Sequence, residues 1–126
     1  MLHHLTLGVS DLARSAGFYD AVLTPLGYGR VWTDAGAVGY GPPEGAENFA
    51  IELAGPGDSA SSPRFHVAFR APSREALAEF HRTALAHGGR DNPSPGMHHD
   101  HDEHFYPVHL FDPDGHRIEA VFTDRT

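Results

Sequence analysis

Apolar and polar residues alternate in several short stretches of the chain, which is the period of a half-buried β-strand. In residues 5–9 the apolar positions are Leu5, Leu7 and Val9, and residues 65–70 repeat the same alternation. We predict further strands in five stretches: 28–33, 37–41, 48–53, 105–111 and 116–123. The last two flank Asp112-Pro-Asp-Gly115, which is typical of a tight turn, so they are expected to form a hairpin.

A helical period follows each of the two alternating strands. The first helix is predicted to begin at Ser10 or Asp11, both good N-caps, and to run to Gly27. The second is predicted to begin after Ser73 and to end at Gly88-Gly89, since glycine commonly terminates helices. Both halves of the chain are assigned the order β-α-β-β-β, although one strand of the second half is not located.

The two halves also match each other in sequence, without a gap, at an offset of 62 residues. The matching pairs are His4 with His66, Phe18 with Phe80, Leu23 with Leu85 and Gly27 with Gly89, and the apolar helix positions are expected in the core. A repeat of this length is too short for two independent domains. We predict one α+β domain, residues 1–126, in which modules 1–55 and 64–126 are joined by the Gly-, Ser- and Pro-rich linker 56–63. The two tandem βαβββ modules are expected to form a curved, cup-shaped mixed sheet with helices on its convex face.

Each module brings one histidine and one glutamate to the sheet face that the apolar residues leave open. His4 and Glu52 are 48 residues apart in the first module, and His66 and Glu119 are 53 residues apart in the second. Two buried carboxylates that face each other are costly, and a divalent cation removes that cost. We therefore predict a four-ligand metal site at a pseudo-twofold axis. The alternative is that the histidines are ordinary core residues and that each glutamate pairs with an arginine.

The composition narrows this chemistry. The chain has no cysteine, so a metal would be held by nitrogen and oxygen, which favours zinc, nickel, cobalt, manganese or ferrous iron. Lysine is absent as well, which excludes Schiff-base chemistry, and the net charge of −8 argues against nucleic acid as a partner. The amino terminus does not read as a signal peptide and no apolar run reaches the length of a membrane span. A soluble cytoplasmic protein is expected.

Several segments resemble the glyoxalase / bleomycin-resistance / extradiol-dioxygenase (vicinal oxygen chelate) superfamily, namely residues 4–15, 18–19, 25–28 and 112–119. The resemblance covers essentially the whole chain. It implies that paired βαβββ modules form a cup around a divalent metal, with a small-molecule substrate and commonly a homodimer. The implied ligands are a histidine on the first strand of each module and a carboxylate on the last strand, which are His4, Glu52, His66 and Glu119.

The set of ligands resembles one branch of this superfamily more than the others. A glutamate at every expected position looks like glyoxalase I, in which the metal stabilises an enediolate and a glutamate is the general base. By that resemblance Glu52 or Glu119 would be the base, with a slight preference for Glu52. In that enzyme the position of Gly8 carries an arginine that helps to hold glutathione, so specificity for glutathione is not expected here.

Three further residues are candidates for substrate binding. Arg70 shares a strand face with His66, where it could hold a carboxylate or form a salt bridge with an acidic neighbour. His101 and His104 belong to the His- and acid-rich segment 97–104, and related proteins often carry a loop here that borders the pocket. The alternatives for this segment are metal capture, a lid, a pH-sensitive switch or a solvated acidic loop.

The expected function is a metal-dependent glyoxalase-like enzyme, a lyase or isomerase that acts on a small oxygenated substrate. A metal-free protein that sequesters a drug or metabolite, as in bleomycin resistance, is the first alternative. A ring-cleaving dioxygenase with ferrous iron is the second, and Glu52 would then have to leave the metal. The intact ligand set favours the enzyme, because a protein that only sequesters a ligand needs no pair of buried carboxylates. The acidic surface mildly favours the sequestering protein.

Overall fold

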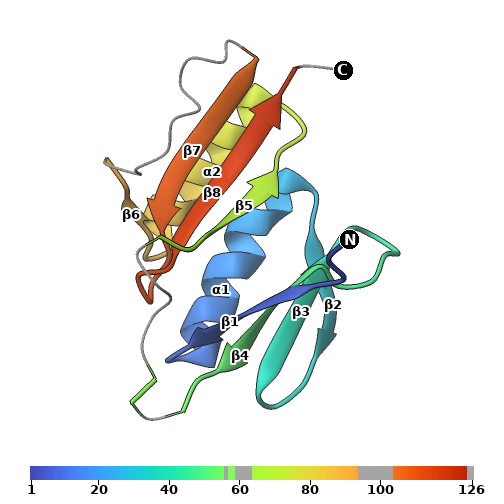
Figure 1. The fold of residues 1–126 in the computed structure, drawn as a ribbon, viewed down its shortest axis with the longest axis vertical. Coiled ribbons are helices and arrows are strands. Elements are labelled where there is room, and N and C mark those ends of the chain that lie inside the picture. The colour runs from blue at the N-terminus through green and yellow to red at the C-terminus, as the bar shows by residue number, and fades with distance from the viewer. Residues whose placement is uncertain (56, 59–63, 94–103, 125–126) are drawn as a thin grey trace.

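The computed structural model describes residues 1–55, 57–58, 64–93 and 104–124, and it contains two βαβββ modules in tandem (Figure 1). The first module consists of β1 (Leu5–Val9), α1 (Leu12–Leu23), a short 3₁₀ helix η1 (Thr24–Leu26), β2 (Gly29–Thr33), β3 (Ala37–Gly41) and β4 (Phe49–Leu53). The second consists of β5 (His66–Arg70), α2 (Arg74–Ala86), β6 (Arg90–Asp91), β7 (Phe105–Phe111) and β8 (Arg117–Thr123). The predicted α+β class and tandem modules are confirmed.

Each module forms its own four-stranded sheet with the same topology. The strand order is β1-β4-β3-β2 in the first and β5-β8-β7-β6 in the second. The first strand of each module pairs in parallel with the last, and the remaining pairs are antiparallel. The first strands, β1 and β5, therefore lie at sheet edges.

Local sequence signals account for the ends of the helices. The side chain of Asp11 accepts a hydrogen bond from the backbone N–H of Arg14, and Ser73 caps α2 in the same way through the N–H of Ala76. After η1, Gly27 adopts a left-handed conformation with φ of 94°, which only glycine takes without strain. Both N-caps and this stop agree with the prediction.

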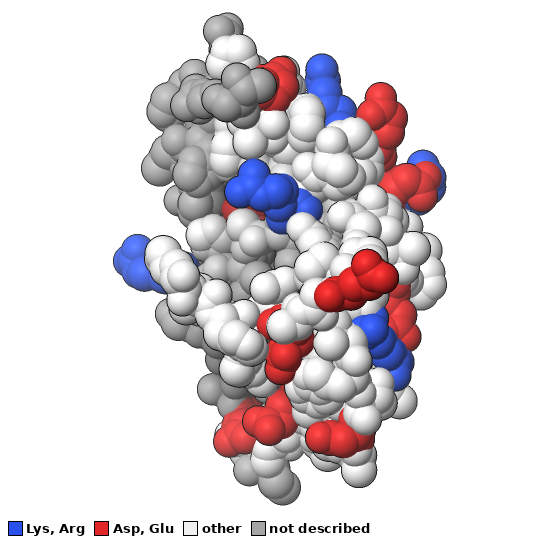
Figure 2. Space-filling model, turned by 90° about the vertical axis from the view of Figure 1, so that its right-hand side faces the viewer, with Lys and Arg blue, Asp and Glu red and all other residues white. Residues whose placement is uncertain are grey.

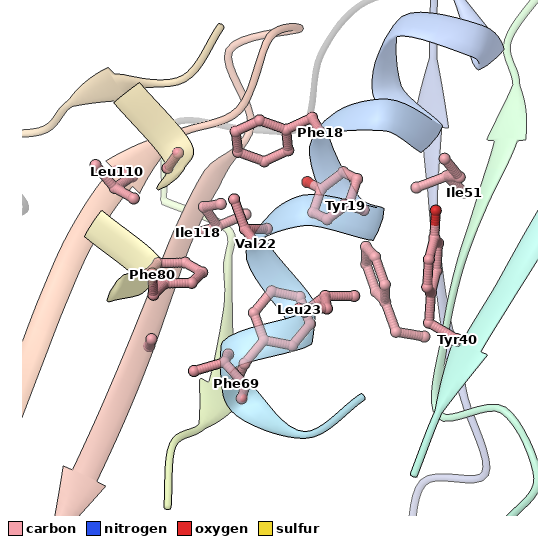
Figure 3. Close-up of a cluster of buried hydrophobic side chains, with 14 of the residues drawn as sticks. Phe18, Tyr19, Val22, Leu23, Tyr40, Ile51, Phe69, Phe80, Leu110 and Ile118 are labelled. Atoms are coloured by element: carbon pink, nitrogen blue, oxygen red, sulfur yellow. The ribbon is translucent and has the colours of Figure 1, made fainter. Parts of the chain in front are cut away.

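The core is shared by both modules, and α1 lies at its centre (Figure 3). Tyr19 points toward Ile51 of the first sheet, whereas Phe18 lies toward Leu110 and Ile118 of the second. All of these side chains are almost fully buried. The expectation for Leu85 was wrong, since this residue is 46% exposed. The buried positions of α2 end at Ala84, and the next residue is turned about 100° away around the helix.

The turn of the β7–β8 hairpin holds the two modules together by polar contacts. Asp114 accepts hydrogen bonds from the N–H and Oγ of Ser10, from Arg14 and from Ser15 at the start of α1. Next to it, the hydroxyl of Tyr19 donates to the buried carboxylate of Asp112 at 2.6 Å. The turn thus connects residues about a hundred positions apart.

Two predicted segments fall largely or wholly outside the described residues. These are most of the linker 56–63 and residues 97–103 of the His-rich segment, including His101. The short strand β6 had not been located from the sequence. Among the described helices, none has the length and apolar character needed to cross a membrane.

Candidate functional site

The open face of the second sheet gathers most of the polar chemistry of its module. The helix α2 lies behind β7 and β8, so the side chains that point away from it line the front of the sheet (Figure 1). The register places Ala68, Glu119 and His109 side by side on β5, β8 and β7. His66 and Arg70 lie on the same face of β5 as Ala68, each two residues away from it, because strand residues alternate in direction.

Glu119 is the central residue of this face. Its side chain is buried, and the whole residue is only 1% exposed. One carboxylate oxygen, Oε1, lies 3.3 Å from Nε2 of His66 and 3.8 Å from Nδ1 of His109. The other oxygen, Oε2, has no hydrogen-bond partner in the described structure. A buried polar atom without a partner costs about 1–3 kcal/mol, so the fold alone does not account for a glutamate here.

The first module presents its two candidate ligands on a different sheet. His4 is the residue before β1, is exposed, and its Nδ1 lies 2.8 Å from Nδ1 of His3. Glu52 is exposed on β4. Among the described residues of the chain, no three His, Asp or Glu side chains are arranged to hold a metal ion. The four predicted ligands therefore do not form one cluster. His66 and Glu119 lie together on the second sheet, whereas Glu52 lies opposite Gly8 on the first sheet, four residues along β1 from His4.

The predicted substrate-binding residues are distributed as follows. Arg70 is exposed on the open face of the second sheet, and in the described part of the chain it forms no ion pair. His104 lies just before β7, where its Nδ1 is 2.7 Å from the carboxylate of Asp124. The structure does not describe His101.

His109 was not among the predicted site residues, because the strand registers had not been assigned, although the sequence contained the signal for it. The Asp112–Gly115 turn fixes the register of the hairpin, with Phe111 opposite Arg117. Moving two residues away from the turn along each strand from that pair brings His109 opposite Glu119. Deriving the strand register of the hairpin from the position of the turn would therefore have identified this histidine.

Two cavities border these side chains. A cavity of about 390 Å³ lies over the open face of the second sheet and is lined by residues that include His66, Arg70, Phe105 and Glu119. A second cavity, of about 430 Å³, lies at the seam between the first module and β5. His66 and Arg70 line both cavities, so the two adjoin at β5.

The surface charge is mixed on the side of the molecule that Figure 2 shows. The face in Figure 2 shows arginines that stand apart from one another among acidic and neutral side chains. The chain as a whole carries a net charge of −8. Any attraction for an anion on this face therefore comes from individual arginines and not from a broad basic surface.

Tandem βαβββ modules, each with a histidine at its first strand and a glutamate on its last, define a protein of the vicinal oxygen chelate class. The chain belongs to the Glyoxalase/Bleomycin resistance protein/Dioxygenase superfamily, whose family model matches residues 1–120.

Solved structures agree with this assignment. A glyoxalase/bleomycin resistance protein from Albidiferax ferrireducens is 33% identical, with 95% of this chain and 96% of that chain covered and a TM-score of 0.79. A putative glyoxalase from Bacillus halodurans is 23% identical, with 97% and 95% covered and a TM-score of 0.73. The fosfomycin resistance protein FosX from Listeria monocytogenes is 18% identical, with 97% and 92% covered and a TM-score of 0.68. The last two show a common fold only. None of the curated proteins matches the chain significantly.

Proposed function

We propose that the protein is a metal-dependent enzyme of glyoxalase type, a lyase or isomerase that acts on a small oxygenated substrate. The observation that carries the proposal is Glu119, a buried carboxylate with one unpartnered oxygen beside His66. A divalent cation is the partner that such an oxygen lacks, because it compensates the charge and occupies the open lone pairs. The nitrogen and oxygen donors fit zinc, nickel, cobalt, manganese or ferrous iron.

The remaining ligands in this proposal come from a second copy of the chain. His4 and Glu52 are exposed on the first module, and one chain does not bring them to His66 and Glu119. A symmetric dimer in which the first module of one copy faces the second module of the other would complete two equivalent sites. The expected homodimer thus becomes a requirement of the metal site.

We propose different roles for the two glutamates. When bound, the ion would polarise a substrate carbonyl and offset the charge that develops on its oxygen. Glu119 is held by the sheet between two imidazoles, which suits a ligand that stays in place. Glu52 is exposed and can reorient, so we favour it as the base that takes the proton from the carbon next to the carbonyl.

A metal-free binding protein is the second candidate. The seam cavity of about 430 Å³, lined largely by apolar side chains, favours it, because such a cavity can hold a small molecule without any metal. In this alternative Glu119 would be a buried acid without a catalytic purpose, which is why we prefer the enzyme.

Metal analysis separates the two candidates. We expect the purified protein to contain about one divalent ion per chain, and we expect His66→Ala to lose at least nine-tenths of it. Loss of a residue that only supports a ligand weakens metal binding roughly 10–100-fold, and loss of the ligand itself should weaken it at least as much. The matched control is His81→Ala, since this histidine pairs with Asp91 at the surface, and it should retain the metal. A wild-type protein that takes up no metal from a mixture of the five candidate ions would contradict the enzyme and support sequestration.

A further inference from the structure

Arg70 differs from the other arginines whose ion pairs the structure describes. Arg14, Arg30 and Arg82 each face a carboxylate, on Asp114, Asp20 and Glu79. Arg70 forms no such pair within the described residues. Its neighbours across the sheet are Val121 and then Pro107, so no acid stands opposite it. In a chain with 17 acidic and 9 basic residues, an arginine that forms no ion pair with a described carboxylate is available to a ligand.

The fold does not require an arginine at this position. The residue 62 positions earlier, on the equivalent strand of the first module, is Gly8. Both strands pair in parallel with the last strand of their module, with Gly8 opposite Glu52 and Arg70 opposite Val121. The arginine thus belongs to the second module alone, on the strand that also carries His66.

The seam cavity begins at this arginine. Its walls are largely apolar and include Leu5, Leu23, Phe49, Val67 and Phe69. At one rim the hydroxyl of Tyr28 donates a hydrogen bond to the carbonyl oxygen of Arg70 at 3.0 Å, which ties the first module to the edge of β5. A volume of about 430 Å³ is within the usual range for a small-molecule site.

We propose that the ligand of this protein is an organic carboxylate with a bulky apolar group, such as an aryl or branched alkyl chain. The carboxylate pairs with the guanidinium of Arg70, and the apolar group fills the seam cavity. A guanidinium matches a carboxylate in two parallel hydrogen bonds, and the apolar walls favour a hydrocarbon group over water. The inference names the substrate class of the proposed enzyme. It rests on the proposed function only in one respect, namely that oxygen atoms of the ligand would reach the metal beside His66.

Calorimetric titration with 3-phenylpropionate, in protein treated with EDTA, tests both parts of the ligand without any metal. We expect saturable binding to the wild type. Propionate lacks the ring and 3-phenylpropionamide lacks the charge, and each should bind about tenfold more weakly or worse, because one charged hydrogen bond or one buried apolar group contributes about 1.5–3 kcal/mol.

Variants at exposed arginines locate the contact. Arg70→Ala should lose about tenfold or more in affinity for 3-phenylpropionate but not for the amide, and Arg70→Lys should lose less. Arg82→Ala is the matched control, because Arg82 is exposed on α2 and faces Glu79; its affinity should equal that of the wild type. All three variants change exposed side chains, so the fold is expected to persist.

Two results would overturn the inference. One is equal binding of the acid and the amide, and the other is no binding of 3-phenylpropionate at all, as when a second copy of the chain fills the seam. Metal analysis keeps the two proposals apart. A protein that binds the acid through Arg70 but no metal is a binding protein for organic carboxylates. A protein that binds metal but not the acid retains the proposed function and loses the substrate class.

Discussion

Glu119 is the residue at which folding and function oppose each other most directly. It is buried at the centre of the second sheet with one oxygen unpartnered, where an apolar side chain would pack without that cost. The side chains nearest to its carboxylate are the imidazoles of His66 and His109, which both lie beside the other oxygen. A residue that serves only the fold would not be placed in this way.

This conflict predicts that Glu119→Gln has opposite effects on metal binding and on stability. Metal should be lost, because the amide is a poor ligand for a divalent ion. In EDTA-treated protein the free energy of unfolding should stay equal or rise, by up to about 1–3 kcal/mol, since a buried charge with an unpaired oxygen is removed. Urea unfolding at pH 7 measures this.

Glu52→Gln is the matched control for stability. Glu52 is exposed, so the same substitution there should change the free energy of unfolding by less than about 0.5 kcal/mol. A marked destabilisation by Glu119→Gln without metal would mean that the carboxylate supports the fold, and the metal proposal would lose its main argument.

At the scale of elements, the β7–β8 turn does more than reverse the chain. Asp114 receives its hydrogen bonds from Ser10, just before α1, and from Ser15 within it, so the hairpin of one module holds the helix of the other. Burial by itself would raise the pKa of Asp114, but the hydrogen bonds from Ser10 and Ser15, with the charge of Arg14, lower it below 3.8. The ionised form is therefore the one that stabilises the fold.

Asp114→Asn should destabilise the protein in a pH-dependent way. A carboxyl whose pKa is lowered by folding stabilises the protein above its unfolded pKa of 3.8, and this stabilisation is lost as the pH falls through the folded value. The difference in unfolding free energy between wild type and variant should be about 1–2 kcal/mol at pH 7 and should shrink below about pH 4. Urea unfolding at pH 7, 5 and 3.5 measures it.

The pKa of the neighbouring Asp112 is shifted in the opposite direction, and this shift does not obscure the test. Burial raises its pKa, against the hydrogen bond from Tyr19, so its ionisation costs stability as the pH rises through the folded value. Wild type and variant share this cost, and it cancels in their difference. Asp34→Asn, in an exposed turn, is the control. A destabilisation by Asp114→Asn that does not depend on pH would show that the shape of the Asp114 side chain matters and its charge does not.

At the scale of the whole molecule, the arrangement of the two sheets decides where a metal site can form. The strands β1 and β5 lie at the edges of different sheets, and the candidate ligands of each module stay on their own sheet. If the proposed dimer exists, each site combines His4 of one copy with His66 of the other.

Mixing two inactive variants tests this directly. His4→Ala and His66→Ala should each bind little metal, whereas a co-refolded equal mixture should recover roughly a quarter of the wild-type content, because half of the dimers are mixed and each has one intact site. Metal analysis of the dimer fraction from size-exclusion chromatography measures the recovery. No recovery in a mixture shown to contain mixed dimers would place all ligands within one chain.

Much of the fold followed from local signals. The strand periods, the caps Asp11 and Ser73 and the stop at Gly27 depend on residues close in sequence, and all appear as predicted. The same alternation put His66 and Glu119 on one face of the second sheet. Leu85 was placed wrongly, because a helical period gives the width of a buried stripe only approximately and packing sets its edge.

The sequence by itself determined the two modules, their element order and the face of each strand, because backbone dihedral preferences and side-chain periods are local properties. Only the tertiary structure decided which chemical groups meet. The contact of His66 with Glu119, the seam cavity at Arg70 and the separation of the ligands over two sheets all arise from contacts between distant parts of the chain. Such contacts follow from how the sheets pack around α1, and no local pattern encodes that packing.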